Sequence, residues 1–192
     1  MESIDPVGAT SDHGRARLLP SHSSTSPGAT GYTFRYDAHP EDREHVRRIV
    51  ASTGFFNPAE IDVAVELVHE RLTRGTASGY NFVFLERDGE VLGYACYGPI
   101  AGTAASFDLY WIAVDHSTRR RGLGRLLLAQ TERLIHQAGA RRVYIETSHR
   151  WQYAPTRRFY ERSGYRVEAL LKDFYAPGDD KAIYVKVLTD KL

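Results

Sequence analysis

Four arginines surround a pair of glycines near the middle of the chain. The arginines are Arg119, Arg120, Arg121 and Arg125, and the glycines are Gly122 and Gly124. Two glycines separated by one residue let the backbone approach a ligand closely, and arginine side chains form charge-assisted hydrogen bonds with phosphate. The stretch therefore predicts a turn that binds a phosphate or pyrophosphate group.

The segments on either side of this turn would hold it in place. Strand-like Ile112-Ala113-Val114 precedes it, and the apolar run Leu126-Leu127-Leu128 follows it. This order indicates a strand, a turn and a helix whose N-terminal N–H groups favour an anion. The turn is not a P-loop, because no Gly-Lys-Ser/Thr closes it, and Leu127 stands where a dinucleotide fingerprint has its third glycine. An ordinary arginine-rich turn before a surface helix is the alternative.

The spacing Arg-x-x-Gly-x-Gly, five residues after a strand-ending valine, resembles the acetyl-coenzyme A motif of the GNAT superfamily of N-acetyltransferases. The segments downstream fit the same family. They are a helix over Leu126 to Ala138, a strand over Arg142 to Thr147, and a final signature from Phe159-Tyr160 to Gly164-Tyr165. The resemblance covers roughly residues 32–189. It implies an α/β GNAT fold with a mixed, mostly antiparallel seven-stranded sheet flanked by helices.

The same resemblance implies where acetyl-coenzyme A binds. The fourth strand would diverge from the fifth, often with a bulge, so that the Ile112 amide faces the acetyl carbonyl and Val114 faces the pantetheine arm. The expected contacts are Ile112, Ala113, Val114, Arg119, Arg120, Arg121, Gly122, Leu123, Gly124 and Arg125. Tyr153 departs from the family pattern, because many members carry an asparagine there to touch the pantetheine arm.

The remaining elements follow from periodicity and from glycine and proline signals. Helices are expected from about His39 to Thr53 and from Ala59 to Arg74, with Pro58 and Gly75 as punctuation. Strands are expected over residues 32–36, 82–86, 91–97, 107–114, 165–171 and 182–188. An Asp-Gly turn joins the second and third strands as a hairpin.

Transfer of an acetyl group from a thioester to an amine requires a base and an acid. The acid is expected to be Tyr160, which family members commonly use to protonate the departing thiolate; a core tyrosine is the alternative. Asp108 leads for the base, because it stands six residues before Val114, where histone-modifying members have a glutamate. Glu146 and His149 are further candidates, and Asp108 could instead only bond neighbouring backbone. No metal is expected.

Composition agrees with one catalytic domain. The chain has 192 residues, of which 42% are hydrophobic and 26% charged, and its net charge is +1. This charge gives no general attraction to nucleic acid. The lone Cys96 cannot form an internal disulfide, and no membrane-spanning run or signal peptide is apparent, so a cytoplasmic location is expected. Residues 1–31 are rich in small and polar residues and are expected to be a disordered tail, followed by a GNAT domain over residues 32–192.

The amine that accepts the acetyl group is the feature that the sequence determines least. Its expected walls are Gly54-Phe55-Phe56-Asn57 and the segment from Asp173 to Asp180. Aromatic groups beside carboxylates suit the primary amine of a small molecule or an amino-acid derivative. Acetylation of a protein N-terminus or lysine, and a non-catalytic acyl-coenzyme A sensor, are the alternatives. Neither nucleic acid nor membrane is expected as a partner, and a homodimer is left open.

Overall fold

The computed structural model describes residues 31–118 and 121–188 of the chain. The helices are α1 (Asp42–Ser52), α2 (Pro58–Arg74), α3 (Leu123–Gln137) and α4 (Ala154–Arg162). The strands are β1 (Thr33–Arg35), β2 (Asn81–Arg87), β3 (Glu90–Pro99), β4 (Ser106–Val114), β5 (Arg142–Ser148), β6 (Arg166–Ala176) and β7 (Asp179–Val187). Three short 3₁₀ turns are η1 (Gly75–Ser78), η2 (His116–Thr118) and η3 (Trp151–Tyr153).

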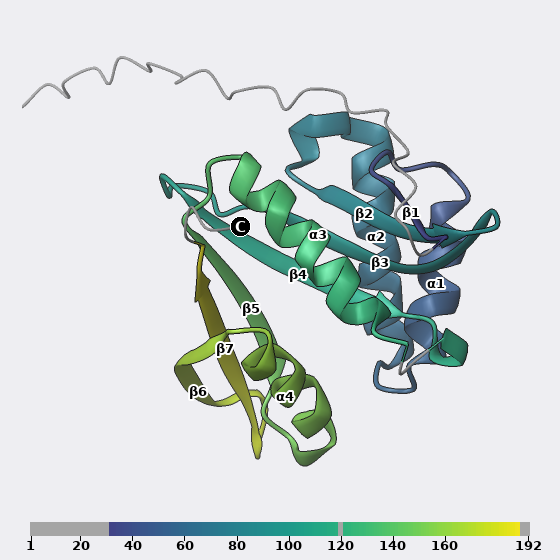
Figure 1. The fold of residues 1–192 in the computed structure, drawn as a ribbon. Coiled ribbons are helices and arrows are strands. Elements are labelled where there is room, and N and C mark those ends of the chain that lie inside the picture. Colours follow the sequence, from purple (N-terminus) through teal and green to yellow (C-terminus); the bar gives the residue numbers. More distant parts are fainter. Residues whose placement is uncertain (1–30, 119–120, 189–192) are drawn as a thin grey trace, which may run out of the picture.

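The seven strands form one sheet in the order β1-β2-β3-β4-β5-β7-β6. Every neighbouring pair is antiparallel except β4 and β5, which are parallel. The predicted mixed, mostly antiparallel sheet is confirmed. Figure 1 shows that β4 and β5 diverge along their length, so that the sheet has two arms.

Helices cover both faces of the sheet (Figure 1), and a hydrophobic cluster lies on each face. On one face, Leu127 and Leu128 of α3 pack with Val83, Val143 and other apolar side chains of the strands. On the other face, residues of α1 and α2 pack with aromatic side chains of β2 and β3. Because side chains alternate along a strand, β2, β3 and β4 contribute to both clusters.

Local signals set several element boundaries as expected. Asn57 begins α2 with a capping box, in which its side chain accepts from the Glu60 N–H and Glu60 accepts from the Asn57 N–H. Pro58 is the first helical residue, and Gly75 follows the last one with φ +59°. Asp88 and Gly89 both have positive φ, which is the conformation of a type I′ hairpin turn.

Two of the differences from the sequence-based boundaries lie near the candidate site. The helix expected from Leu126 begins at Leu123, because Gly122 adopts the left-handed conformation and serves as its N-cap. The loop expected from Asp173 to Asp180 is mostly strand, since β6 runs to Ala176 and β7 starts at Asp179. Side-chain bonds support this irregular hairpin: the Asp180 carboxylate accepts the Asp173 N–H, and the Asp173 carboxylate accepts the Gly178 N–H.

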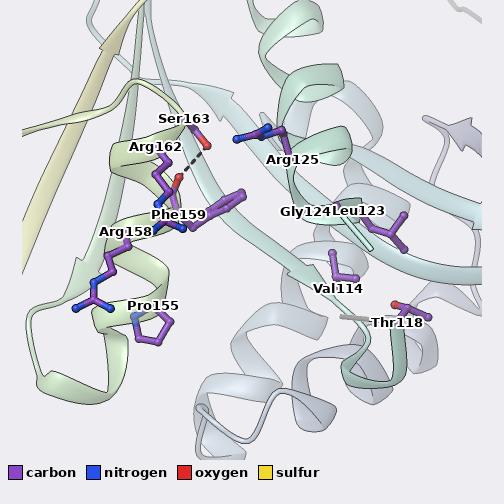
Figure 2. A pocket seen from close by; sticks show the side chains of 11 residues that line it. Val114, Thr118, Leu123, Gly124, Arg125, Pro155, Arg158, Phe159, Arg162 and Ser163 are labelled. Carbon is purple, nitrogen blue, oxygen red and sulfur yellow. Dashed lines mark hydrogen bonds between the residues drawn. The ribbon is translucent and has the colours of Figure 1, made fainter. Parts of the chain in front are cut away.

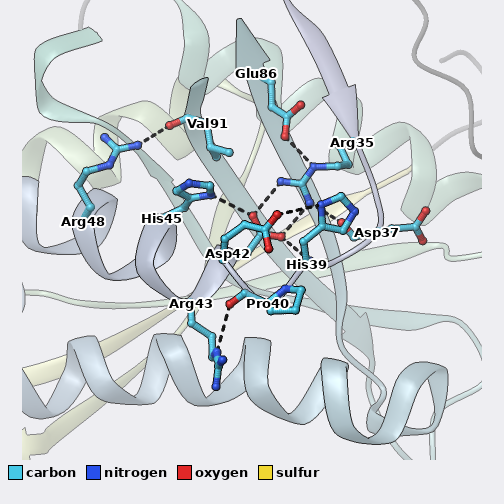
Figure 3. A network of polar contacts seen from close by, with 11 residues as sticks. Arg35, Asp37, His39, Pro40, Asp42, Arg43, His45, Arg48, Glu86 and Val91 are labelled. Carbon is cyan, nitrogen blue, oxygen red and sulfur yellow. Dashed lines mark hydrogen bonds and ion pairs between the residues drawn. The ribbon is translucent and has the colours of Figure 1, made fainter. Parts of the chain in front are cut away.

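The start of α1 is held by a buried ion pair (Figure 3). The guanidinium of Arg35 makes two hydrogen bonds of 2.8 Å with the carboxylate of Asp42, which is fully buried. Asp42 also accepts the His39 N–H at 2.7 Å, and Arg35 contacts Glu86. Burial alone would raise the pKa of Asp42, but the hydrogen bonds and charge of Arg35, with the His39 N–H, lower it overall.

We expect Asp42→Asn to lower the free energy of unfolding by about 3 kcal/mol, because it removes one partner of a buried pair. The folded-state pKa of Asp42 is depressed, so its stabilisation is present above the unfolded value near 3.9 and is lost as pH falls through the folded value. Urea unfolding at pH 7 and at pH 3 measures both effects, and the variant should lose less stability on acidification than the wild type.

Asp62→Asn is the matched control. Asp62 forms an exposed ion pair with Arg47 at 2.8 Å, and exposed pairs contribute at most about 1 kcal/mol. Equal losses in the two variants would contradict a special role for the Asp42 network.

Candidate active site

The sheet opens between β4 and β5. Their parallel pairing joins only residues 106–108 of β4 to residues 142–144 of β5, whereas β4 stays paired with β3 as far as Val114. The β3 pairing shifts between Cys96 and Tyr97, which leaves Tyr110 as an extra, bulged residue of β4. From Leu109 to Val114, the β5-facing edge of β4 therefore has no partner among the strands that the structure describes. Both the divergence and the bulge agree with what the family resemblance implied.

The chain leaves β4 through a turn organised by Asp115. Its carboxylate accepts the Ser117 N–H at 3.0 Å and the Ser117 hydroxyl at 2.7 Å, and it pairs with Arg48 of α1. The Ser52 hydroxyl of α1 also accepts the His116 N–H at 3.1 Å. Burial acts to raise the pKa of Asp115, but the Ser117 hydrogen bonds and the Arg48 charge lower it overall. Helix α1 thus holds the turn that leads to the glycines.

The glycine-rich turn forms the N-terminus of α3. Gly122 has φ +76° and is the N-cap, and none of the described side chains (residues 31–118 and 121–188) caps this helix. A Cβ on Gly122 would have no heavy atom within 4 Å, so its conformation, and not crowding, calls for glycine. An uncapped helix start presents backbone N–H groups to an anion, as the sequence predicted.

A cavity of about 510 Å³ lies in front of this helix start, between α3 and α4 (Figure 2). Val114, Thr118 and residues 122–125 form one side. The other side comes from α4 and the residue after it: Pro155, Arg158, Phe159, Arg162 and Ser163. Sequence reasoning missed this second side. Its signal is the helical spacing i, i+3, i+4, i+7 of the four α4 residues, two of which are arginines.

The structure brings together part of the predicted coenzyme site. Val114, Gly122, Leu123, Gly124 and Arg125 line the cavity. Arg121 instead lines a smaller adjoining cavity of about 250 Å³, together with Thr118 and the β2–β3 turn.

The other predicted contacts lie elsewhere. The side chain of Ile112 packs against the hydrophobic cluster on the α3 side of the sheet. The side chain of Ala113 is buried in the cluster on the opposite side. Ala113 can therefore meet a ligand in this cavity only through its backbone. Arg119 and Arg120 lie outside the described residues.

Gly124→Val is expected to weaken coenzyme A binding at least about tenfold while leaving the fold intact. Gly124 lies in the first turn of α3, so the backbone tolerates a side chain, and an added Cβ would lie 3.6 Å from the Phe159 ring across the groove. Gly122→Val would instead strain a left-handed position. Calorimetric titration with coenzyme A is the measurement, and Ala129→Val, on the exposed side of α3, is the control. Unchanged affinity would show that Gly124 does not contact coenzyme A.

The two candidate carboxylates lie together on the other face of the sheet. Leu109 and Val143 point toward α3, so alternation places Asp108, Tyr144 and Glu146 on the opposite side. Asp108 is paired with Tyr144 in the last register before the strands diverge. Burial and the nearby charge of Glu146 raise the pKa of Asp108, against a smaller lowering by Lys181. A raised pKa makes this carboxylate a better proton acceptor.

Tyr160 of α4 belongs to the hydrophobic cluster that also contains buried apolar side chains of α3. Its ring is 5.9 Å from that of Tyr165 and 6.0 Å from that of Tyr184, and only 6% of the residue is exposed. Burial raises the pKa of its phenol well above the usual value, so the group is protonated at any working pH. The neighbouring Phe159, and not Tyr160, lines the cavity. His149, the third candidate base, donates its backbone N–H to Asp180.

The two segments expected to line the site of the acceptor amine, residues 54–57 and 173–180, lie near other aromatic residues. The ring of Phe55 lies 5.6 Å from that of Tyr153, and that of Phe56 lies 4.9 Å from that of Trp111 on β4. On β6, Tyr175 is half exposed, and burial followed by the charge of Glu146 raises its pKa to about 12. The α1–α2 connection and the β6–β7 hairpin therefore flank the carboxylate side of the opening.

Neither a helix long and apolar enough to cross a bilayer nor a group of three or more His, Cys, Asp or Glu suited to a metal ion occurs between residues 31 and 188, positions 119–120 aside.

A sheet that opens beside a helix N-terminus offers a groove to an extended ligand that carries phosphate. The model of the family "Acetyltransferase (GNAT) domain" matches residues 78–167. A GNAT-family protein from Desulfovibrio desulfuricans is 51% identical, with a TM-score of 0.81, over 82% of this chain and 99% of that one. The chain therefore belongs to the GNAT family and is an acetyl-coenzyme A-dependent acetyltransferase.

More distant structures share the fold. Ard1 from Thermoplasma volcanium is 20% identical, with a TM-score of 0.66, over 83% of this chain and 99% of that one. A GNAT-family acetyltransferase from Elizabethkingia anophelis, solved with acetyl-CoA bound, is 15% identical with a TM-score of 0.61 over the same shares. The comparison with curated proteins gave no significant match.

Proposed function

We propose that this enzyme transfers the acetyl group of acetyl-coenzyme A to the primary amine of a small molecule or an amino-acid derivative. The observation that carries the proposal is the opening of the sheet after Asp108 and Tyr144. The start of α3, which would bind phosphate, lies on one face of the sheet at this opening, and Asp108, the proposed proton acceptor, lies on the other face. A thioester lying in the opening would present its carbonyl between the two faces.

The groove on the α3 face suits coenzyme A. The N–H groups at the start of α3 would bind the pyrophosphate, and the guanidinium groups of Arg125, Arg158 and Arg162 provide further cations for phosphate. The unpaired edge of β4 would bond the pantetheine arm as a substitute strand, with the Ile112 amide toward the acetyl carbonyl.

The carboxylate face supplies the proton transfers. Asp108 would accept a proton from the acceptor ammonium, directly or through a water. The free amine nitrogen then bonds to the acetyl carbon while the carbon–sulfur bond breaks, and the nitrogen releases its surplus proton to solvent to leave the neutral amide. The departing thiolate takes a proton from Tyr160, which regains one from solvent. The expected contact of Tyr160 with the sulfur stays a prediction, because Phe159 is the α4 aromatic that lines the cavity.

The test is a screen that follows free thiol release from acetyl-coenzyme A. One arm contains small primary amines and amino-acid derivatives, and the other contains peptides with free N-termini or internal lysines. We expect turnover in the first arm. Turnover with peptides alone would make the enzyme a protein acetyltransferase. Coenzyme binding without thiol release in either arm would favour the non-catalytic sensor.

A further inference from the structure

Lys181 of β7 already occupies a cation site on the acceptor face. Its ammonium lies 2.7 Å from the Glu146 carboxylate and 3.6 Å from the centre of the Phe174 ring. A carboxylate and an aromatic face are the two contacts that an ammonium ligand would seek. The Lys181 side chain is only 11% exposed, so its position is well held.

The other carboxylates on this side also have partners. Asp179 pairs with Arg150 at 2.8 Å and accepts the Ser148 hydroxyl, and Asp180 pairs with Lys172 at 3.2 Å. Glu60 accepts the Asn57 N–H in the capping box of α2. The carboxylate of Asp108, in contrast, forms no hydrogen bond or ion pair with any residue that the structure describes, and only the charges of Glu146 and Lys181 act on it. The face therefore offers a ligand one carboxylate without a partner.

We infer that Lys181 determines acceptor specificity: it is a tethered cation that occupies Glu146 and restricts the acceptor to a single ammonium group beside Asp108. The inference rests on the proposed function and names its substrate class, a monoamine with an uncharged body. The aromatic side chains at this opening, Tyr80, Tyr110 and Tyr175, would pack against that body. A second ammonium on the acceptor would meet the charge of Lys181.

The experiment compares linear primary monoamines with diamines of the same chain length, from four to about eight carbons, as acceptors. The ratio of kcat/KM for monoamine to diamine is measured by thiol release. The wild type should favour the monoamine about tenfold or more. Lys181→Met exposes the Glu146 carboxylate, so the ratio should shift toward the diamine about tenfold, the change that one screened charge contact produces.

Three variants show whether the shift comes from charge. Lys181→Arg keeps the cation and should keep the wild-type ratio. The double variant Glu146→Gln with Lys181→Met removes both charges and should also prefer the monoamine, whatever its absolute rate. Lys186→Met breaks a similar 2.6 Å pair with Glu132 on the α3 side of β7 and should leave the ratio unchanged.

Two results would overturn the inference and leave the proposed function standing. One is a wild type that prefers diamines, and the other is a folded Lys181→Met variant with an unchanged ratio of kcat/KM for monoamine to diamine. If neither kind of amine releases thiol with the wild type while peptides do, the proposed small-molecule function fails, and the inference fails with it.

Discussion

Replacing Tyr160 by phenylalanine is expected to lower kcat by roughly 10²- to 10⁴-fold, the range for loss of a general acid. The change keeps the ring and its packing between Tyr165 and Tyr184, so the fold and the affinity for acetyl-coenzyme A should change little. Burial holds the pKa of the phenol far above neutral pH. The proton is therefore present throughout the working range, and the defect should be independent of pH below about 9.

Steady-state kinetics with a saturating amine measure the effect. Tyr184→Phe is the control, because it removes a neighbouring hydroxyl that has no part in the proposed chemistry. The Tyr184 hydroxyl donates a hydrogen bond of 3.3 Å to the Glu161 carboxylate. We expect it to retain the wild-type kcat. If Tyr160→Phe is as active as the control, water protonates the thiolate and Tyr160 is a core residue.

Asp108→Asn is expected to lower kcat/KM at pH 7 by roughly 10²-fold or more, because it removes the proposed proton acceptor without changing side-chain size. The defect should diminish as pH rises toward the pKa of the amine, since more of the free acceptor is then already deprotonated.

The pH profile gives the sign of the coupling between the two carboxylates. In the wild type, kcat/KM should fall with acidification as Asp108 is protonated, and its raised pKa places this limb above the usual value near 3.9. Glu146→Gln removes a negative charge that raises the pKa of Asp108, so the limb should move to lower pH. A larger, pH-dependent loss in Glu146→Gln than in Asp108→Asn would transfer the role of base to Glu146.

Local patterns were enough to predict the family, the order of elements and the helix start that suits phosphate. Glycine at 122 is required by a positive φ, and Asp88-Gly89 by a type I′ turn; both are properties of short segments. The alternation of apolar residues predicted most strands within a few residues, because one side of each strand is buried. The predicted tail over residues 1–31 lies outside the described residues except for Gly31 and stays a prediction.

Tertiary structure decided which of the predicted residues meet. Pairing of β4 with β5 stops at Asp108, and only the whole sheet determines where two strands separate. That separation places α4, with Arg158 and Arg162, across from α3 to complete the groove. The same long-range packing buries Tyr160, pairs Lys181 with Glu146 and leaves Asp108 without a partner among the described residues. Local sequence cannot specify such contacts, because they depend on the register between segments that lie far apart in the chain.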